Sequence, residues 1–351
     1  MKTRVALLTF HRSLNYGAVC QTYATCRLLN ELGCEPILID LRIDEPYSPM
    51  QRLLGLLRTF RFARFRRRHY PASTRRDRTV AELRADPPAA DIYLVGSDQT
   101  WNPLITRELT DAFWLDFGPD TTKRVGFSAS FGQDTWPVDD MAQTAKLKTL
   151  ALRFAAVSIR ETGGVTLCRD LFGIDAVQTL DPTLLIDNFD ELTGPIAPRH
   201  HIASYKFIGS PDYYACLKEL ERAYGKPVEI LGRLRPVPGF RYRYPQSVAR
   251  WIESIAAADL VLTDSFHGVA VSIMYRRNFV AFVGDDRRIG RIRSLLVQLG
   301  LEERLYVGRP VDTKRIQKLC DTPIDYEAVG RRLARMQDAS LAFLRRMVDR
   351  A

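Results

Sequence analysis

The sequence predicts an α/β protein with two parallel sheets, and three observations support this fold class. Short apolar runs that can form strands alternate with amphipathic stretches that can form helices, a pattern typical of βαβ units. A Pro- and Gly-containing stretch at 192–198 interrupts this alternation, which then resumes. The length of 351 residues suits two domains of about 100–200 residues each. We therefore expect two Rossmann-like domains facing a cleft.

The first domain is expected to span residues 1–195, to form the acceptor side and to begin as strand, helix and strand, with residues 52–78 as an Arg-rich insertion. Apolar residues roughly follow the helical period between 17 and 32, and Gly33 stands where a helix C-cap is expected. The apolar runs that predict its strands lie at 5–8, 37–39, 92–95, 125–127 and 155–159.

The second domain is expected at 196–320, with strands predicted at 202–205, 228–231, 260–262 and 279–282. Residues 321–351 form a closing segment whose apolar positions predict an amphipathic helix at 326–350. One possible arrangement is that this helix packs back against the first domain.

The composition excludes several classes of protein. Apolar residues make up 46% and charged residues 26%, which is ordinary for a globular protein. No apolar run approaches the ~18 residues that span a bilayer, and the first apolar run is too short for a signal peptide. The six cysteines form no CxxC pair, so we expect reduced thiols, no metal site and a cytoplasmic protein. No resident cofactor is expected.

The positive charge is concentrated in one segment. Residues 52–78 hold ten arginines and a single acid, and therefore carry nine of the ten net positive charges. Leucines and a phenylalanine at helical spacing make the start of this segment a basic amphipathic helix. Such a helix suits an anionic membrane surface at the inner face of the membrane, but also a solvated surface insertion. A nucleic-acid partner is not expected, because no recognition motif accompanies the charge.

Polar turns follow the predicted strands of the first domain, at the sheet edge where open α/β proteins bind ligands. The turn at residues 11–17 leads into the N-terminus of a predicted helix, and a helix N-terminus favours binding of an anion or of sugar hydroxyls. Another places Trp101 where its ring could cover a pyranose; the alternative is that Asp98 caps a helix and Trp101 lies in the core. The candidate acceptor-binding residues are Asn15, Tyr16, Gly17, Gln21, Ser97, Asp98, Trp101, Asn102 and Ser130.

Charged residues follow other predicted strands. Arg160 ends a buried strand, where it either pairs with Glu161 or grips a carboxylate or phosphate. His267 stands at the start of a helix after a strand, well placed to meet an anion and to transfer a proton. Lys206 and Arg291 are candidates for further positive charge.

Several motifs together resemble the polysaccharide pyruvyltransferase, or ketal pyruvyltransferase, family. They occur in the order Asn15-Tyr16-Gly17-Ala18, Gly96-Ser97-Asp98-Gln99, Ser158-Ile159-Arg160-Glu161, Asp181-Pro182-Thr183 and Thr263-Asp264-Ser265-Phe266-His267-Gly268. The resemblance implies a glycosyltransferase-B-like pair of Rossmann domains. It also implies transfer of pyruvate from phosphoenolpyruvate, a co-substrate, to two hydroxyls of a sugar, giving a cyclic ketal and phosphate. Acceptors in the family belong to capsule, exopolysaccharide or cell-wall glycans, often linked to a lipid.

The resemblance also assigns roles. It implies that Arg160 and His267 are catalytic and lie near a donor held by the second domain. The expected donor-binding residues are Arg160, Lys206, Ser265, Phe266, His267, Gly268 and Arg291. Phosphoenolpyruvate carries about three negative charges, which arginine, lysine and helix-terminal N–H groups can bind. Two alternatives stay open: a nucleotide-sugar-dependent glycosyltransferase of the same fold, and a non-enzymatic protein that binds membrane surfaces.

Overall fold

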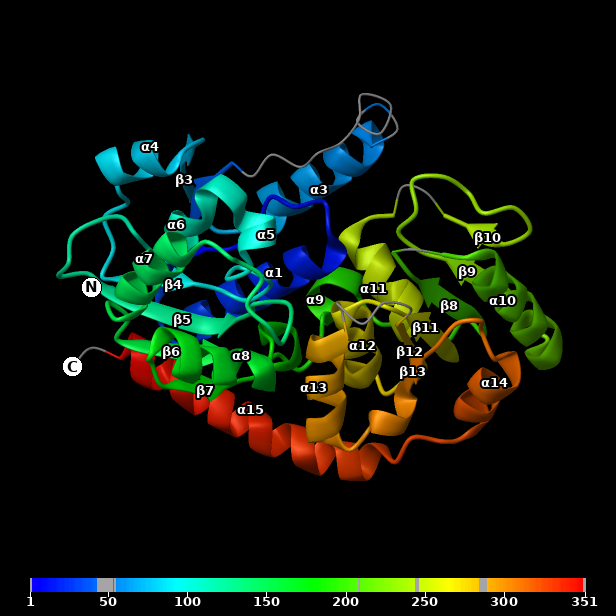
Figure 1. The fold of residues 1–351 in the computed structure, drawn as a ribbon. Helices are drawn as coiled ribbons and strands as arrows, with labels where there is room; N and C mark the ends of the chain where they lie inside the picture. Colours follow the sequence, from blue (N-terminus) through cyan, green and yellow to red (C-terminus); the bar gives the residue numbers. More distant parts are fainter. Residues whose placement is uncertain are drawn as a thin grey trace. The chain divides into compact units, whose positions relative to one another are not determined.

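The protein is described by a computed structural model that covers residues 2–42, 53, 55–207, 209–243, 246–283 and 289–349 (Figure 1). It divides into two compact units. The N-terminal unit comprises Met1–Pro46, His69–Ile186 and Ala334–Ala351, and the C-terminal unit comprises Tyr47–Arg68 and Asp187–Leu333. The division thus falls at 186/187, whereas the sequence places it at 195/196. The insertion expected in the first domain also groups differently, because its part up to Arg68 belongs to the C-terminal unit. Arg52 and Arg350, each at one end of a predicted segment, lie outside the described residues.

The N-terminal unit is built on a seven-stranded sheet of order β3-β2-β1-β4-β5-β6-β7. Every neighbouring pair in it is parallel, so all strands end at one edge. The strands are β1 (Arg4–Leu8), β2 (Glu35–Leu41), β3 (Ser73–Asp77), β4 (Ile92–Val95), β5 (Lys123–Ala129), β6 (Ala156–Ile159) and β7 (Ala176–Gln178). The five strands expected from apolar runs are confirmed. The sequence missed the edge strands β3, which has no apolar residue, and β7, which has only three residues.

Helices of the N-terminal unit follow the strands and complete its core. They are α1 (Tyr16–Glu31), α4 (Val80–Ala85), α5 (Pro103–Thr106), α6 (Thr110–Phe113), α7 (Met141–Ala151) and α8 (Thr162–Leu167). Asn15 caps α1, and Gly33 follows its end with a φ of 76°, a backbone conformation that glycine adopts without strain. The core contains Trp101 and Trp114, whose rings stack with centroids 4.2 Å apart.

The C-terminal unit is built on a six-stranded parallel sheet of order β10-β9-β8-β11-β12-β13. Its strands are β8 (Ile202–Tyr205), β9 (Val228–Ile230), β10 (Arg241–Tyr242), β11 (Leu260–Thr263), β12 (Asn278–Val283) and β13 (Leu305–Val307). The four predicted strands are confirmed, and the short edge strands β10 and β13 were missed. The helices are α3 (Leu56–His69), α9 (Asp190–Thr193), α10 (Pro211–Tyr224), α11 (Val248–Ala256), α12 (Phe266–Met274), α13 (Ile289–Leu299) and α14 (Thr313–Asp321).

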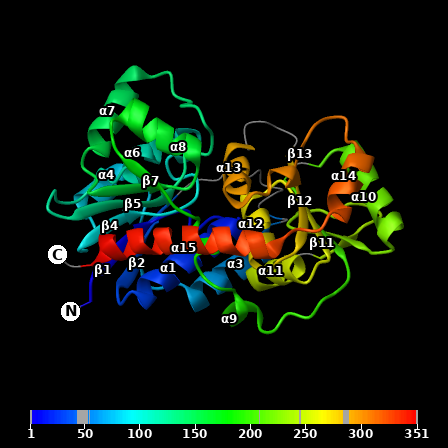
Figure 2. The same ribbon diagram turned by 90° about the horizontal axis from the view of Figure 1, so that it is seen from below.

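The chain closes with the predicted amphipathic helix, α15 (Tyr326–Val348), which Figure 2 shows in red as one continuous helix. Its first turns belong to the C-terminal unit, where the Arg332 guanidinium donates to the carbonyl of Leu299 at 2.8 Å. Its remainder belongs to the N-terminal unit, where the Ser340 hydroxyl accepts a hydrogen bond from the amide of Leu180 at 3.0 Å. Within the described ranges, no helix is both long enough and apolar enough to cross a membrane.

All six cysteines are buried free thiols. Burial raises the pKa of Cys26 and of Cys320 to about 12, and that of Cys216 to about 11. Thiolates are therefore scarce at neutral pH, which agrees with the expectation of reduced thiols in the core.

Each unit contains a fully buried arginine that binds backbone carbonyls at loop ends. Arg124 donates to the carbonyls of Leu115, Thr122 and Phe117 at 2.9–3.1 Å. Arg304 donates to the Asn278 side chain and to the carbonyls of Leu319, Thr322 and Pro323 at 2.6–3.0 Å. Burial lowers the pKa of both guanidinium groups. Both side chains serve the fold, because each guanidinium binds several carbonyls and so fixes the loop that carries them.

Replacing Arg304 with methionine (Arg304→Met) should lower the free energy of unfolding by about 3–5 kcal/mol, because three carbonyls and the Asn278 side chain lose the buried cation that binds them. Arg293→Met, at an exposed position of α13, should change it by less than about 0.5 kcal/mol. Urea denaturation of both variants checks this. Equal stability losses would refute the structural role of Arg304.

Candidate functional site

The carboxyl edge of the N-terminal sheet gathers several of the predicted residues in one buried network. Arg160, directly after β6, has a side chain with no solvent exposure. Its guanidinium pairs with Asp181 at 2.8 Å and with Asp98 at 3.3 Å, and Glu161 lies 3.9 Å away. Burial alone would lower the pKa of Arg160, but the charges of these three carboxylates raise it above its ordinary value. Glu161 is therefore one of three carboxylates around Arg160, and Asp181 and Asp98 lie closer to the guanidinium than Glu161 does.

Serines complete this network. The Ser97 hydroxyl donates to Asp181 at 2.7 Å, and the Ser130 hydroxyl donates to Glu161 at 3.0 Å. Glu161 also accepts hydrogen bonds from the backbone amides of Phe131 and Gly132, at 2.8 and 3.3 Å. Glu161 thus fixes the turn after β5, and Arg160 joins the ends of β4, β6 and β7. Ser97 and Ser130 are both fully buried.

Asp98 differs from the rest of the network in two respects. Its side chain retains 13% exposure, and its backbone has a φ of 79°. Ser128, on the neighbouring strand β5, also has a positive φ, of 53°. Residues other than glycine rarely adopt a positive φ, and such strained backbone positions cluster at functional sites. Asp98 is therefore the member of the network best placed to meet a ligand.

The expectation that Trp101 covers a sugar is corrected by the structure. Its ring is fully buried, lies flat against Trp114 and meets the rings of Phe131 and Phe154 at its edges. The indole N–H donates to the carbonyl of Phe113 at 3.0 Å. Asn102 caps the short helix α5 by accepting the amide of Leu104 at 3.1 Å. The alternative of a core tryptophan holds because the aromatic cluster around it excludes solvent.

The loop before α1 uses its predicted residues mainly to build the helix. The Asn15 side chain accepts the amides of Gly17 and Ala18 at 2.8 and 3.3 Å. Gln21 is fully buried and donates to the Thr9 hydroxyl at 2.8 Å and to the carbonyl of Ala18 at 2.9 Å. Tyr16 is also buried, whereas Asn15 is partly exposed. These residues position the end of β1, and Asn15 is the predicted residue of this loop with exposed surface.

The carboxyl edge of the C-terminal sheet places the predicted donor residues on neighbouring strands. Lys206 follows β8, and its ammonium group pairs with Asp264, directly after β11, at 3.2 Å. The same ammonium lies 4.7 Å from the ring centroid of Phe282 and donates to the carbonyl of that residue at 3.3 Å. Asp264 also accepts the amide of Phe207 at 2.9 Å. Lys206 and Asp264 are both buried and form a fixed pair.

The turn after β11 leads directly into α12. The Ser265 hydroxyl caps this helix by accepting the amide of Gly268 at 3.3 Å. Phe266 and His267 form its first turn, where the helix dipole is positive and attracts anions, and both side chains are buried. Gly268 has no space for a side chain, because a Cβ atom there would collide with Thr263. The predicted motif is therefore a tightly packed helix start that carries one imidazole.

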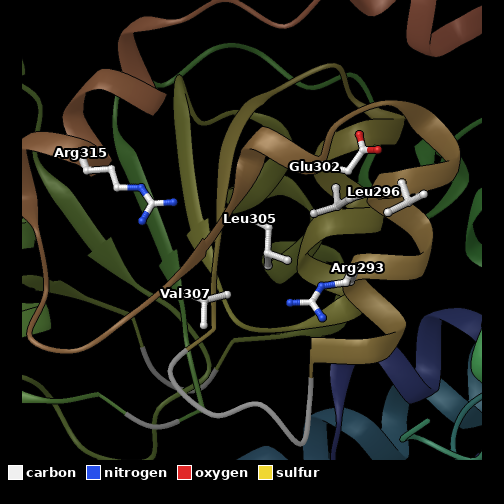
Figure 3. Close-up of a pocket in the computed structure, with 7 residues that line it drawn as sticks. Arg293, Leu296, Glu302, Leu305, Val307 and Arg315 are labelled. Carbon is white, nitrogen blue, oxygen red and sulfur yellow. The ribbon is translucent and has the colours of Figure 1, made fainter.

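Two arginines of α13 have different surroundings. Arg291 lies in the first turn of the helix and is half-buried, whereas Arg293 is exposed. Arg293 lines a cavity of about 240 Å³ beside the edge strand β13, together with Glu302 and Arg315 (Figure 3). Leucine and valine side chains of α13 and β13 form the rest of its wall. None of the predicted site residues lines this cavity.

Reasoning from sequence named Glu161 as a partner of Arg160 but missed the pairing of two further carboxylates, Asp181 and Asp264, that hold these edges together. Asp181 and Glu161 neutralise Arg160, and Asp264 neutralises Lys206. A signal was available, because each buried cation at a strand end requires a carboxylate from a neighbouring strand end. In the part of the chain that the structure describes, no group of three His, Cys, Asp or Glu side chains could hold a metal ion.

Solved structures with the same architecture are distant in sequence. UDP-GlcNAc 2-epimerase from Neisseria meningitidis, bound to UDP-GlcNAc, is 10% identical with a TM-score of 0.52, covering 98% of this chain and 100% of that one. The Methanocaldococcus jannaschii UDP-GlcNAc 2-epimerase, in complex with UDP-GlcNAc and UDP, is 12% identical with a TM-score of 0.52, covering 97% and 100%. A Thermobaculum terrenum O-GlcNAc transferase mutant is 14% identical with a TM-score of 0.51, covering 99% and 68%. These similarities establish the expected glycosyltransferase-B-like fold.

No curated protein matches the chain significantly. A family model does match: the one described as polysaccharide pyruvyl transferase covers residues 15–286, most of the chain. The matched range contains the edge network around Arg160 and the helix start around His267. The chain therefore belongs to the polysaccharide pyruvyl transferase family.

Proposed function

We propose that the protein transfers the pyruvyl group of phosphoenolpyruvate to two hydroxyls of a sugar, forming a cyclic ketal and releasing phosphate. The observation that carries this proposal is the start of α12, where a buried histidine follows a parallel strand beside the Lys206–Asp264 pair. Membership of the family supports the reaction class. The proposed acceptor is a sugar of a polysaccharide or of its lipid-linked precursor, and the proposed enzyme is cytoplasmic.

In this proposal the C-terminal unit binds the donor. Phosphoenolpyruvate carries a carboxylate and a phosphate, which need several cationic or N–H donors. Asp264 already neutralises part of the charge of Lys206, so the α12 N-terminus and Arg291 supply the larger share of positive potential. Ser265, Phe266 and Gly268 hold the helix start in place.

The proposed chemistry balances without a further reactant. His267 delivers a proton to the methylene carbon of phosphoenolpyruvate, which becomes a methyl group, while the first sugar hydroxyl adds to the adjacent carbon. The proton that this hydroxyl loses restores the one that His267 donated. The bond from that carbon to the phosphate oxygen then breaks, and phosphate leaves with the electron pair. The second hydroxyl closes the ketal and releases its proton to the departing phosphate. General acid catalysis of this kind contributes about 10²–10⁴-fold.

For the N-terminal unit we propose the acceptor side, with Asp98 and Asn15 as the contacts to sugar hydroxyls. Both side chains are partly exposed at the carboxyl edge of the sheet. Arg160 would then act through Asp98, whose carboxylate it holds at 3.3 Å, rather than through direct contact with the donor that the resemblance implies. The strained backbone of Asp98 supports this assignment, because a strained residue persists only where its surroundings hold it.

Phosphoenolpyruvate should raise the thermal midpoint by several degrees, because a ligand at 100 times its dissociation constant adds about 2.7 kcal/mol of stability. We expect His267→Gln and Arg291→Gln each to reduce this shift. The matched controls are His200→Gln, at an exposed histidine, and Arg293→Gln, two residues further along α13. Controls that lose the shift together with the test variants, or a shift caused only by a nucleotide sugar, would contradict the donor site.

Arg160→Lys should leave the dissociation constant of phosphoenolpyruvate within twofold of that of the unchanged chain. Turnover should fall at least tenfold, because Asp98 loses its planar partner. Isothermal titration with phosphoenolpyruvate and a phosphate-release assay measure the two effects separately. Loss of phosphoenolpyruvate binding in a folded Arg160→Lys variant would instead return Arg160 to the donor site.

A further inference from the structure

The arginine-rich segment is absorbed neither by the donor site nor by the acceptor site. Six of its ten arginines lie on α3, and the helix contains no acidic residue. A run of six like charges on fourteen residues repels itself, and a surface of opposite charge relieves this repulsion. The two faces of this helix show which kind of partner it fits.

One face of α3 is turned into the protein. Phe62 is completely buried and Phe65 is 8% exposed. At about 100° per residue, these two side chains lie about 60° apart on the helix circumference. They anchor α3, so the opposite face is the one presented to solvent.

The opposite face begins with large apolar side chains. Leu56, Leu57 and Phe60 lie on this face of α3, Leu53 stands three residues before the helix in the sequence, and all four side chains are 59–64% exposed. Across the described residues, eleven large hydrophobic side chains are exposed, and four of them belong to this stripe. Scattered exposed leucines need no explanation, but three large apolar side chains on one helical face, with a fourth just before the helix, indicate an interaction site.

The same stripe continues with cations. Arg64 and Arg67 extend the spacing from Phe60 by one and two helical turns, and Arg61 and Arg68 flank them. All four arginines are exposed. The outward face of α3 is thus apolar over its first turns and cationic over its last turns, while its inward face is held by aromatic rings.

We propose that this outward face docks on an anionic membrane surface. The apolar side chains would enter the boundary between headgroups and acyl chains, and the arginines would bind lipid phosphates. Nucleic acid offers the same phosphate charge but no layer for the four exposed apolar side chains, so the lipid surface accounts for more of the stripe. The inference does not depend on the donor chemistry, because it rests on α3 and on Leu53 just before it.

The test is co-sedimentation of the full chain with vesicles of phosphatidylcholine, either alone or mixed with phosphatidylglycerol, at low and high salt. We expect binding to the anionic vesicles only, with weaker binding at high salt. Leu57→Gln/Phe60→Gln should weaken it at least tenfold. Arg61→Gln/Arg64→Gln/Arg67→Gln should weaken it about a hundredfold, at about fivefold for each arginine.

Two control variants remove the same groups elsewhere. Met141→Gln/Leu152→Gln changes two side chains that are 78% and 64% exposed, and Arg331→Gln/Arg335→Gln/Arg345→Gln removes three exposed arginines of α15. Both should bind within twofold of the unchanged chain. Equal losses in control and test variants, equal binding to neutral vesicles, or no vesicle binding would overturn the proposal. So would tight binding of an RNA oligonucleotide that needs the arginines but not Leu57 and Phe60.

Discussion

A buried positive charge must be neutralised, and this requirement organises the carboxyl edge of the N-terminal sheet. Arg160 has no contact with solvent, so Asp98, Asp181 and Glu161 must approach it from the ends of three strands. Each carboxylate in turn accepts further donors, and the loops after β4, β5, β6 and β7 are fixed by these bonds. Removing the guanidinium would leave three carboxylates facing one another without a counter-charge. The loss of this one side chain would therefore disrupt the whole network.

The C-terminal sheet meets the same requirement with fewer groups. Lys206 is neutralised by Asp264 from the adjacent strand end, and the aromatic faces of Tyr213 and Phe282 surround the ammonium. This pair precedes the start of α12 and leaves the helix dipole and Arg291 as the sources of positive potential. The two edges therefore suit different tasks: the first is rich in carboxylates and hydroxyls, and the second is the side to which we assign an anion.

The sequence predicts the central strands and the positions of candidate residues, but not the orientation or pairing of their side chains. Buried central strands are continuous apolar runs, so nine strands were predicted, whereas edge strands such as β3 and β13 are short or polar and were missed. Candidate residues were found by their place after strands. Their orientation was not, because Trp101 faces the core through ring contacts that come from distant segments. The partners Asp181 and Asp264 stand in the sequence motifs, but their pairing with Arg160 and Lys206 follows only from the order of the strands in each sheet.

Fold and family carry different information about this chain. The epimerases and the O-GlcNAc transferase share its architecture at 10–14% identity, which shows how a glycosyltransferase-B-like scaffold is built and nothing of the chemistry.

The central claim concerns the start of α12, and a crystal structure with phosphoenolpyruvate tests it most directly. We predict the phosphate against the first turn of α12 and near Arg291, with the methylene carbon about 3–3.5 Å from the His267 imidazole. Phosphoenolpyruvate bound instead against Arg160 and Asp98, or in the cavity beside β13, would contradict the account.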